Sequence, residues 1–194
     1  MAILLPRRTR PELAELGALN QPTSGRVDCE MQRAANGMYR LDFTLYGCRI
    51  PVTDATTNGS YGTFKLFDFN EGAISFLGCR QDYTKFAEGS ALTTAIGDAA
   101  FEIGVGTAAI GTAANGTLGD GANENIGQAV SVTNSSGTGT GTAVDGAKTT
   151  AINGTGTAID VNLNWSGTAA SVDASSTIDV WGTISMTFAL LGDD

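Results

Sequence analysis

The sequence predicts an all-β protein: a jelly-roll-like β-sandwich of about eight to ten strands with an extended N-terminal arm that carries a short helix. In its C-terminal stretch, residues at every second position are apolar or glycine: Ile178, Val180, Gly182, Ile184, Met186, Phe188 and Leu190. Similar short runs recur along the chain, separated by threonines and by many of its 26 glycines. Hydrophobic residues make up 42%, which is enough for a buried core.

The other strands are expected where the hydrophobic period is two, at residues 26–31, 39–45, 61–69, 73–79, 82–86, 99–105 and 158–165. In the last of these, Asp160, Asn162 and Asn164 alternate with apolar residues and are expected to face solvent. The Gly/Thr-rich stretch around 104–157 is expected to hold short strands and long surface loops. Residues 26–194 therefore form one predicted domain.

Residues 1–25 form the predicted arm. Thr9 and Glu12 have the spacing of a capping box, and Leu13, Leu16 and Leu19 follow at helical spacing. The basic cluster Arg7, Arg8 and Arg10 precedes this helix. We expect the arm to contact an acidic protein surface through the three arginines together with Leu13 and Leu16.

The net charge of -9 is unevenly distributed, because ten of the 11 basic residues occur by Lys85. The part of the chain after Lys85 is strongly acidic. It argues against a nucleic acid partner, since binding to nucleic acid depends on neutralising phosphates. Residues 1–5 are too short for a secretion signal. The arginines also follow these apolar residues, whereas a signal peptide carries its positive charges before the apolar segment. We expect no membrane partner and synthesis in the cytoplasm.

The chain has no histidine, which excludes histidine-dependent catalysis and histidine-ligated metals. Cys29, Cys48 and Cys79 lack the paired spacing of a zinc site and are expected to be buried free thiols. Oxygen ligands in the loop 119–125 do not follow the order of a calcium-binding loop, so a polar turn is favoured there. The sequence predicts neither an enzyme nor a cofactor.

Large aromatic residues mark a candidate interface between copies of the chain. Trp181 lies on the strand face opposite Ile178 and Val180, among threonines and serines. Both faces of the 61–69 run carry aromatic residues. Because tryptophan and tyrosine are enriched at interface centres, the predicted interface residues are Tyr61, Phe67, Phe69 and Trp181.

Three stretches of the chain resemble the head decoration, or cement, proteins of tailed bacteriophages. They are residues 64–72 with the following 74–78, then 158–165, then 180–193. In the last stretch, Trp181-Gly182-Thr183-Ile184 running to Leu191-Gly192-Asp193 is most similar to the C-terminal signature of that family. The resemblance covers about half of the chain and implies a sandwich on the outside of an icosahedral shell, without catalytic residues.

The predicted function is therefore that of a non-enzymatic capsid decoration protein, located on the outer surface of the virion. Its expected partners are the major capsid protein and copies of itself, as a dimer or trimer. The alternative is a head-fibre or tail-associated protein that binds host glycans through Trp165 or Trp181. A depolymerase that uses two carboxylates is a third hypothesis.

Overall fold

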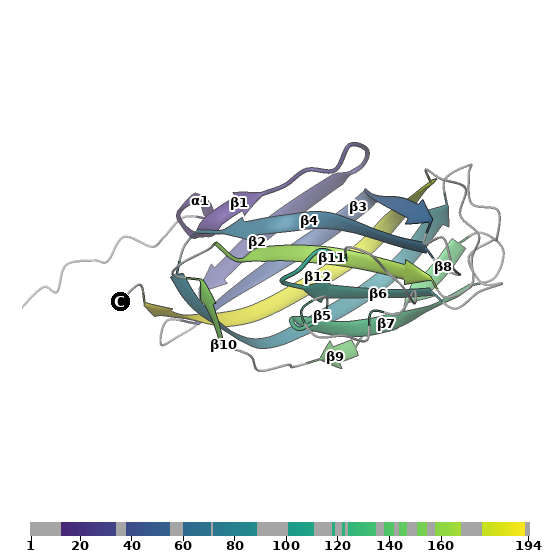
Figure 1. Ribbon diagram of the computed structural model, residues 1–194. Helices are drawn as coiled ribbons and strands as arrows, with labels where there is room; N and C mark the ends of the chain where they lie inside the picture. Colours follow the sequence, from purple (N-terminus) through teal and green to yellow (C-terminus); the bar gives the residue numbers. More distant parts are fainter. Residues whose placement is uncertain are drawn as a thin grey trace, which may run out of the picture.

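The fold is almost entirely β, as predicted, with one short helix in the described part of the chain (Figure 1). The computed structural model describes residues 13–33, 38–54, 60–70, 72–88, 101–110, 118, 122, 124–134, 138–141, 144–146, 151–154, 158–167 and 176–192. The helix is α1 (Leu13–Leu16). The strands are β1 (Gly17–Leu19), β2 (Arg26–Arg33), β3 (Met38–Asp54), β4 (Ser60–Phe69), β5 (Gly72–Glu88), β6 (Phe101–Gly106), β7 (Gly127–Asn134), β8 (Thr138–Gly141), β9 (Val144–Gly146), β10 (Ala151–Gly154), β11 (Asp160–Gly167) and β12 (Ser176–Gly192).

The strands form one antiparallel sheet that closes on itself. Its order is β4-β11-β6-β7-β8-β5-β12-β3, and β3 pairs again with β4 through Val52–Asp54 and Ser60–Gly62. Beyond that short pairing β3 and β4 separate, and each takes a different neighbour: β2 joins β3 and β1 joins β4. The ring is therefore closed at one end of β3 and β4 and open at the other.

β12 is the central strand of the most extensively paired wall. It pairs with β3 on one side and β5 on the other along almost its whole length. The predicted alternation is confirmed from Ile178 to Phe188: Ile178, Val180, Ile184, Met186 and Phe188 are fully buried, and Trp181, Thr183 and Ser185 face outward. It is wrong for Leu190, the last residue of the series, which is 40% exposed.

Side chains from opposite walls of the ring meet in its interior. Phe69 of β4 lies 5.0 Å, centroid to centroid, from Phe188 of β12. Phe86 of β5 lies 5.7 Å from Trp165 of β11. None of these pairs belongs to neighbouring strands, so the interior is filled by side chains and does not form a channel.

Asn162 and Asn164 on the outer face of β11 are buried, at 2% and 0% exposed, in contrast to the prediction, whereas Asp160 is partly exposed. Residues 107–110 after β6 fold back over Asn164. The Asn164 Nδ2 donates to the carbonyl of Ala108 at 2.9 Å, and the Ile110 N–H donates to Asn164 Oδ1 at 3.2 Å. The polar residues of β11 therefore anchor a covering loop.

Residues 13–25 of the predicted arm are packed on the body. β1 pairs with Phe67–Phe69 of β4, and the Asn70 Nδ2 donates to the carbonyl of Glu15 at 2.7 Å. The Leu16 side chain is 6% exposed and belongs to the core. The helical spacing ends at Leu16, since Leu19 lies in β1. No helix among the described residues is long and apolar enough to cross a bilayer.

Candidate functional site

Strands β5, β12, β3 and β2 are consecutive neighbours in the sheet, and we call them the β12 wall. Four side chains form a row across its outer face. Arg26 of β2 is opposite Tyr46 of β3, Tyr46 is opposite Trp181 of β12, and Trp181 is opposite Lys85 of β5. Directly opposed residues in neighbouring strands have their side chains in contact range. We call these four residues the cation–aromatic row.

The row consists of two cation–π pairs placed side by side. The Arg26 guanidinium carbon lies 4.5 Å from the centre of the Tyr46 ring, and the Lys85 Nζ lies 4.5 Å from the centre of the Trp181 ring. Tyr46 is 45% exposed, and Arg26 and Lys85 are also exposed. The row therefore presents two aromatic rings flanked by two positive charges to the outside.

Two β-bulges place Trp181 at the centre of this row. Trp181 pairs with Tyr46 and Val180 with Cys48, which leaves Gly47 as an extra residue in β3. On the other side, Trp181 pairs with Lys85 and Gly182 with Tyr83, which leaves Thr84 as an extra residue in β5. Bulges redirect side chains, and here they fix the direction of the indole.

Gly47 has a structural reason to be glycine. Its φ is +66°, in the left-handed region, and a Cβ at this position would lie 2.9 Å from the indole Cζ2 of Trp181. The Trp181 ring therefore lies directly on the bulge backbone. This contact explains why a large aromatic side chain on an outer face is only partly exposed.

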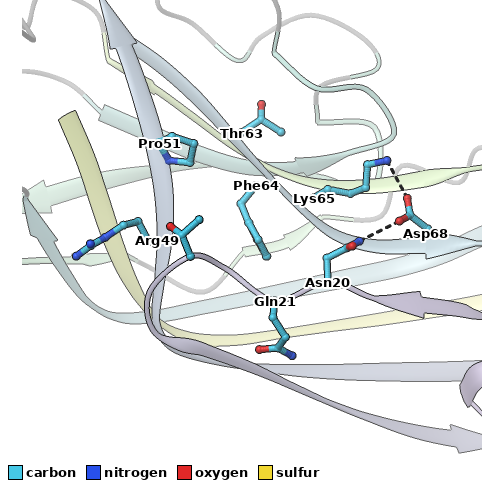
Figure 2. A pocket seen from close by; sticks show the side chains of 9 residues that line it. Asn20, Gln21, Arg49, Pro51, Thr63, Phe64, Lys65 and Asp68 are labelled. Atoms are coloured by element: carbon cyan, nitrogen blue, oxygen red, sulfur yellow. Dashed lines mark hydrogen bonds and ion pairs between the residues drawn. The ribbon is translucent and has the colours of Figure 1, made fainter. Parts of the chain in front are cut away.

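A pocket of about 450 Å³ lies where β3 and β4 begin to separate (Figure 2). Its lining includes Asn20 and Gln21 from the β1–β2 connection, Arg49 and Pro51 from β3, and Phe64 and Lys65 from β4. Phe64 is half-buried and packs against the core, so the pocket has an apolar floor and a polar rim.

The charged groups at the rim are already paired. The Lys65 Nζ lies 2.9 Å from a carboxylate oxygen of Asp68 and 2.9 Å from one of Asp160. Asn20 Nδ2 also donates to Asp68 at 3.0 Å. Burial raises the pKa of Asp68, but the hydrogen bonds from Asn20 and the neighbouring Lys65 outweigh it and hold that pKa below its usual value.

Arg49 closes the other side of the pocket. Its Nε and Nη2 donate to the two carboxylate oxygens of Asp179 at 2.7 and 2.8 Å. This hydrogen-bonded carboxylate raises the pKa of the guanidinium above its ordinary value. The pocket therefore offers apolar surface and amides, with its cations engaged by carboxylates.

The predicted interface residues are not brought together. Trp181 is partly exposed on the β12 wall, and Tyr61 is partly exposed at the start of β4. For Phe67 and Phe69 the prediction is wrong, since they are 0% and 2% exposed and pack in the chain's own core. A register shift beside Leu66 explains the error, because Leu66 and Phe67 are consecutive and both point inward.

Of the predicted capsid-contact residues, Arg7, Arg8 and Arg10 lie outside the described residues. Leu13 is partly buried against the core. For Leu16 the prediction is wrong, because its side chain is enclosed by this chain. Trp165 is 0% exposed, so it offers no surface to a glycan.

The three cysteines are free, as predicted. Cys48 and Cys79 are buried and Cys29 is partly exposed. Burial is the main cause that raises the pKa of each thiol to about 12. No group of three or more potential metal ligands lies together in the part of the chain that the structure describes.

Sequence reasoning found Trp181 but missed Arg26, Tyr46 and Lys85. The available signal was the change of phase at Gly47, where the buried positions pass from Leu45 to Cys48. Such a change marks a bulge and places Tyr46 outside. Comparison with protein-family models, with curated proteins and with solved structures gave no significant match.

Proposed function

We propose that this chain is a non-enzymatic structural protein of a bacteriophage virion, which decorates the outer surface of an icosahedral head and clamps neighbouring major capsid subunits. The observation that carries the proposal is the cation–aromatic row on the outer face of the β12 wall. The sequence resemblance to head decoration proteins supplies the identity of the partner. The expected site of synthesis is the host cytoplasm.

The composition of the row suits an anchor in a protein interface. Tryptophan, tyrosine and arginine are the residues that most often dominate binding energy, and the row contains all three. Its two cations lie on a chain whose net charge is -9. Arg26 is also paired with Asp28 at 3.1 Å, so the positive charge of the row comes mainly from Lys85 and favours docking on an acidic patch.

The proposed architecture is a flattened, jelly-roll-like body in which two walls of the ring act as layers. The contacts between Phe69 and Phe188 and between Phe86 and Trp165 across the interior support this description. A body filled in this way transmits force without changing shape. Binding to the assembled shell stabilises the shell by mass action, and many copies multiply a weak contact.

The pairing of surface carboxylates supports a structural role over hydrolysis. Asp28 is paired with Arg26 at 3.1 Å and Asp42 with Arg40 at 2.8 Å. Asp160 and Asp179 are paired with Lys65 and Arg49. A glycosidase needs one carboxyl group held protonated, and an adjacent cation opposes that.

Recognition of host glycans is the second candidate function. It is favoured by one observation, the adjacent partly exposed rings of Tyr46 and Trp181, because aromatic faces and sugar rings offer matching apolar surfaces. Trp165 has no part in this candidate, since it is buried.

Co-sedimentation of the purified chain with heads that lack it tests the proposal. We expect Trp181→Ala to weaken binding at least tenfold, because the ring is the centre of the row. Leu77→Ala is the matched control, since Leu77 is an exposed apolar residue of β5 outside the row, and it should bind normally. Full binding by Trp181→Ala, or Trp181-dependent binding to a glycan array without head binding, contradicts the decoration role.

A further inference from the structure

The opening in the ring is bordered by half-buried apolar side chains. The partly buried residues that pack against the core are Leu13 of α1, Leu19 of β1, Cys29 and Met31 of β2, and Phe64 of β4. All five belong to the elements that flank the gap between β1–β4 and β2–β3. We call this gap the seam, and the pocket of Figure 2 lies at its narrow end.

The backbone on the β2 side of the seam has free pairing capacity. In the described part of the chain, β2 pairs with β3 along one edge and with no strand along the other. At Val27 the outer edge is closed by a side chain: Gln21 Nε2 donates to the Val27 carbonyl at 2.7 Å, and the Val27 N–H donates to Gln21 Oε1 at 3.1 Å. The Gln21 amide thus imitates a neighbouring strand.

The same edge continues beyond Val27 without such a substitute. Backbone groups in an antiparallel strand point to the same side at every second residue. The N–H and C=O groups of Cys29 and Met31 therefore point in the direction that the Val27 groups take, toward the seam. β1, on the opposite side, likewise pairs with β4 and with no further described strand.

We propose that the seam takes an extended segment of a second copy of this chain as an added β-strand, and that this segment is residues 2–5. An unpaired strand edge beside half-buried apolar side chains is a template for strand addition. The added strand satisfies the edge of β2 and covers Cys29, Met31 and Leu19. The inference concerns contact between copies and does not depend on head binding.

The sequence of residues 2–5 fits this place. Ile3, Leu4 and Leu5 are apolar and supply side chains for both surfaces of a strand. Arg7, Arg8 and Arg10 follow, and the outer face of β2 carries Asp28 and Glu30, both exposed. Asp28 is already paired with Arg26 at 3.1 Å, so Glu30 is the carboxylate of β2 that favours docking of the basic segment.

A second copy is a better donor than the chain itself. The segment is joined to α1 at Leu13, beside β1, and must reverse direction within residues 6–12 to enter its own seam. A segment from a neighbouring copy needs no such reversal.

Light scattering of the full chain and of a variant without residues 2–5 tests the proposal. We expect the full chain to be a dimer or trimer at micromolar concentration and the deletion variant to be a monomer with unchanged circular dichroism. The deletion leaves the cation–aromatic row intact, so failure of head binding is measured separately. A monomeric full chain, or a deletion variant that stays oligomeric, overturns the inference.

Crosslinking locates the segment. Leu4→Cys, treated with a bifunctional thiol reagent, should link to Cys29 of another copy and give covalent oligomers on a denaturing gel. The same variant with Cys29→Ser is the control and should give none through this site. Cys48 and Cys79 are buried and should not compete. A link within one chain, or equal crosslinking without Cys29, contradicts strand exchange.

Discussion

The β12 wall and the seam are built from the same alternating strands and end in opposite states. In the wall, β12 has a partner on both sides, and from Ile178 to Phe188 its residues alternate between a buried interior face and an outer face. At the seam, β1 and β2 each have one described neighbour, and Leu19, Cys29 and Met31 remain half-buried. The difference lies in pairing and not in composition.

This comparison separates two kinds of surface. A fully paired wall holds its outer side chains in fixed places, which suits the cation–aromatic row for docking on a preformed partner. An incompletely paired edge has hydrogen-bonding groups to offer, which suits strand addition. The predictions below test how much each region contributes to stability.

The largest effect is expected in the core behind the wall. Phe188 is 0% exposed, stacks on Tyr39 and meets the Phe69 ring edge to face and the Phe76 ring at a tilt. Phe188→Ala removes these contacts and leaves a cavity, which should lower the free energy of unfolding by about 3–5 kcal/mol. Urea denaturation measures the change. Leu190→Ala, two residues on and 40% exposed, should lose much less, and equal losses would contradict the clean division of β12.

The next effect is expected at the bulge under the row. Gly47→Ala should lower the free energy of unfolding by about 1–3 kcal/mol, because its φ of +66° strains any residue with a Cβ. The new methyl group also displaces the Trp181 ring, so quenching of Trp fluorescence by acrylamide should increase. At Gly78, a Cβ would meet nothing within 4 Å. Gly78→Ala should leave both measurements nearly unchanged.

A smaller effect is expected at the edge of β2. Gln21→Ala removes two hydrogen bonds to Val27 and should cost about 1–2 kcal/mol of unfolding free energy. Amide hydrogen exchange at Val27 should accelerate. Gln32→Ala is the control, because Gln32 is exposed and lies on the same strand as Val27. Unchanged exchange at Val27 in the Gln21 variant would mean that the side chain does not protect the edge.

The smallest effect is a pH dependence at the pocket. The lowered pKa of Asp68 means that its interactions stabilise the fold above the ordinary carboxyl pKa and are lost as the pH falls through the folded value. Asp68→Asn should therefore be slightly less stable than wild type at pH 7. The difference should shrink below about pH 4, where the carboxyl groups of the unfolded chain become protonated. Thermal unfolding of both proteins from pH 7 to 3 measures this difference in stability. A difference that grows as the pH falls would contradict the prediction.

The sequence was sufficient for the strands whose period stays two. It placed Ile178 to Phe188 correctly, because β12 keeps one phase over these residues, but it put Leu190 on the buried face, where the structure leaves it 40% exposed. It misplaced Phe67 and Phe69, because the bulge at Leu66 puts consecutive apolar residues on one side. It also placed Asn162 and Asn164 outside, since nothing in β11 itself indicates that they are buried or that residues 107–110 contact Asn164.

The candidate site was only partly predictable for a related reason. Trp181 was evident from one strand, but the row depends on the registers of four strands, which no single stretch of sequence determines. The seam is even harder to predict from the sequence, because it forms where β3 and β4 stop pairing. Local patterns predict faces, whereas neighbours are decided by the whole sheet.

The proposed decoration role is tested by a subnanometre cryo-EM reconstruction of a virion that carries this chain. If the proposal is right, the chain occupies hundreds of copies on the outer lattice of the head, with Arg26, Tyr46, Trp181 and Lys85 facing the capsid subunits. A chain found only at the tail or in a few copies, or with these four residues turned to solvent, contradicts it.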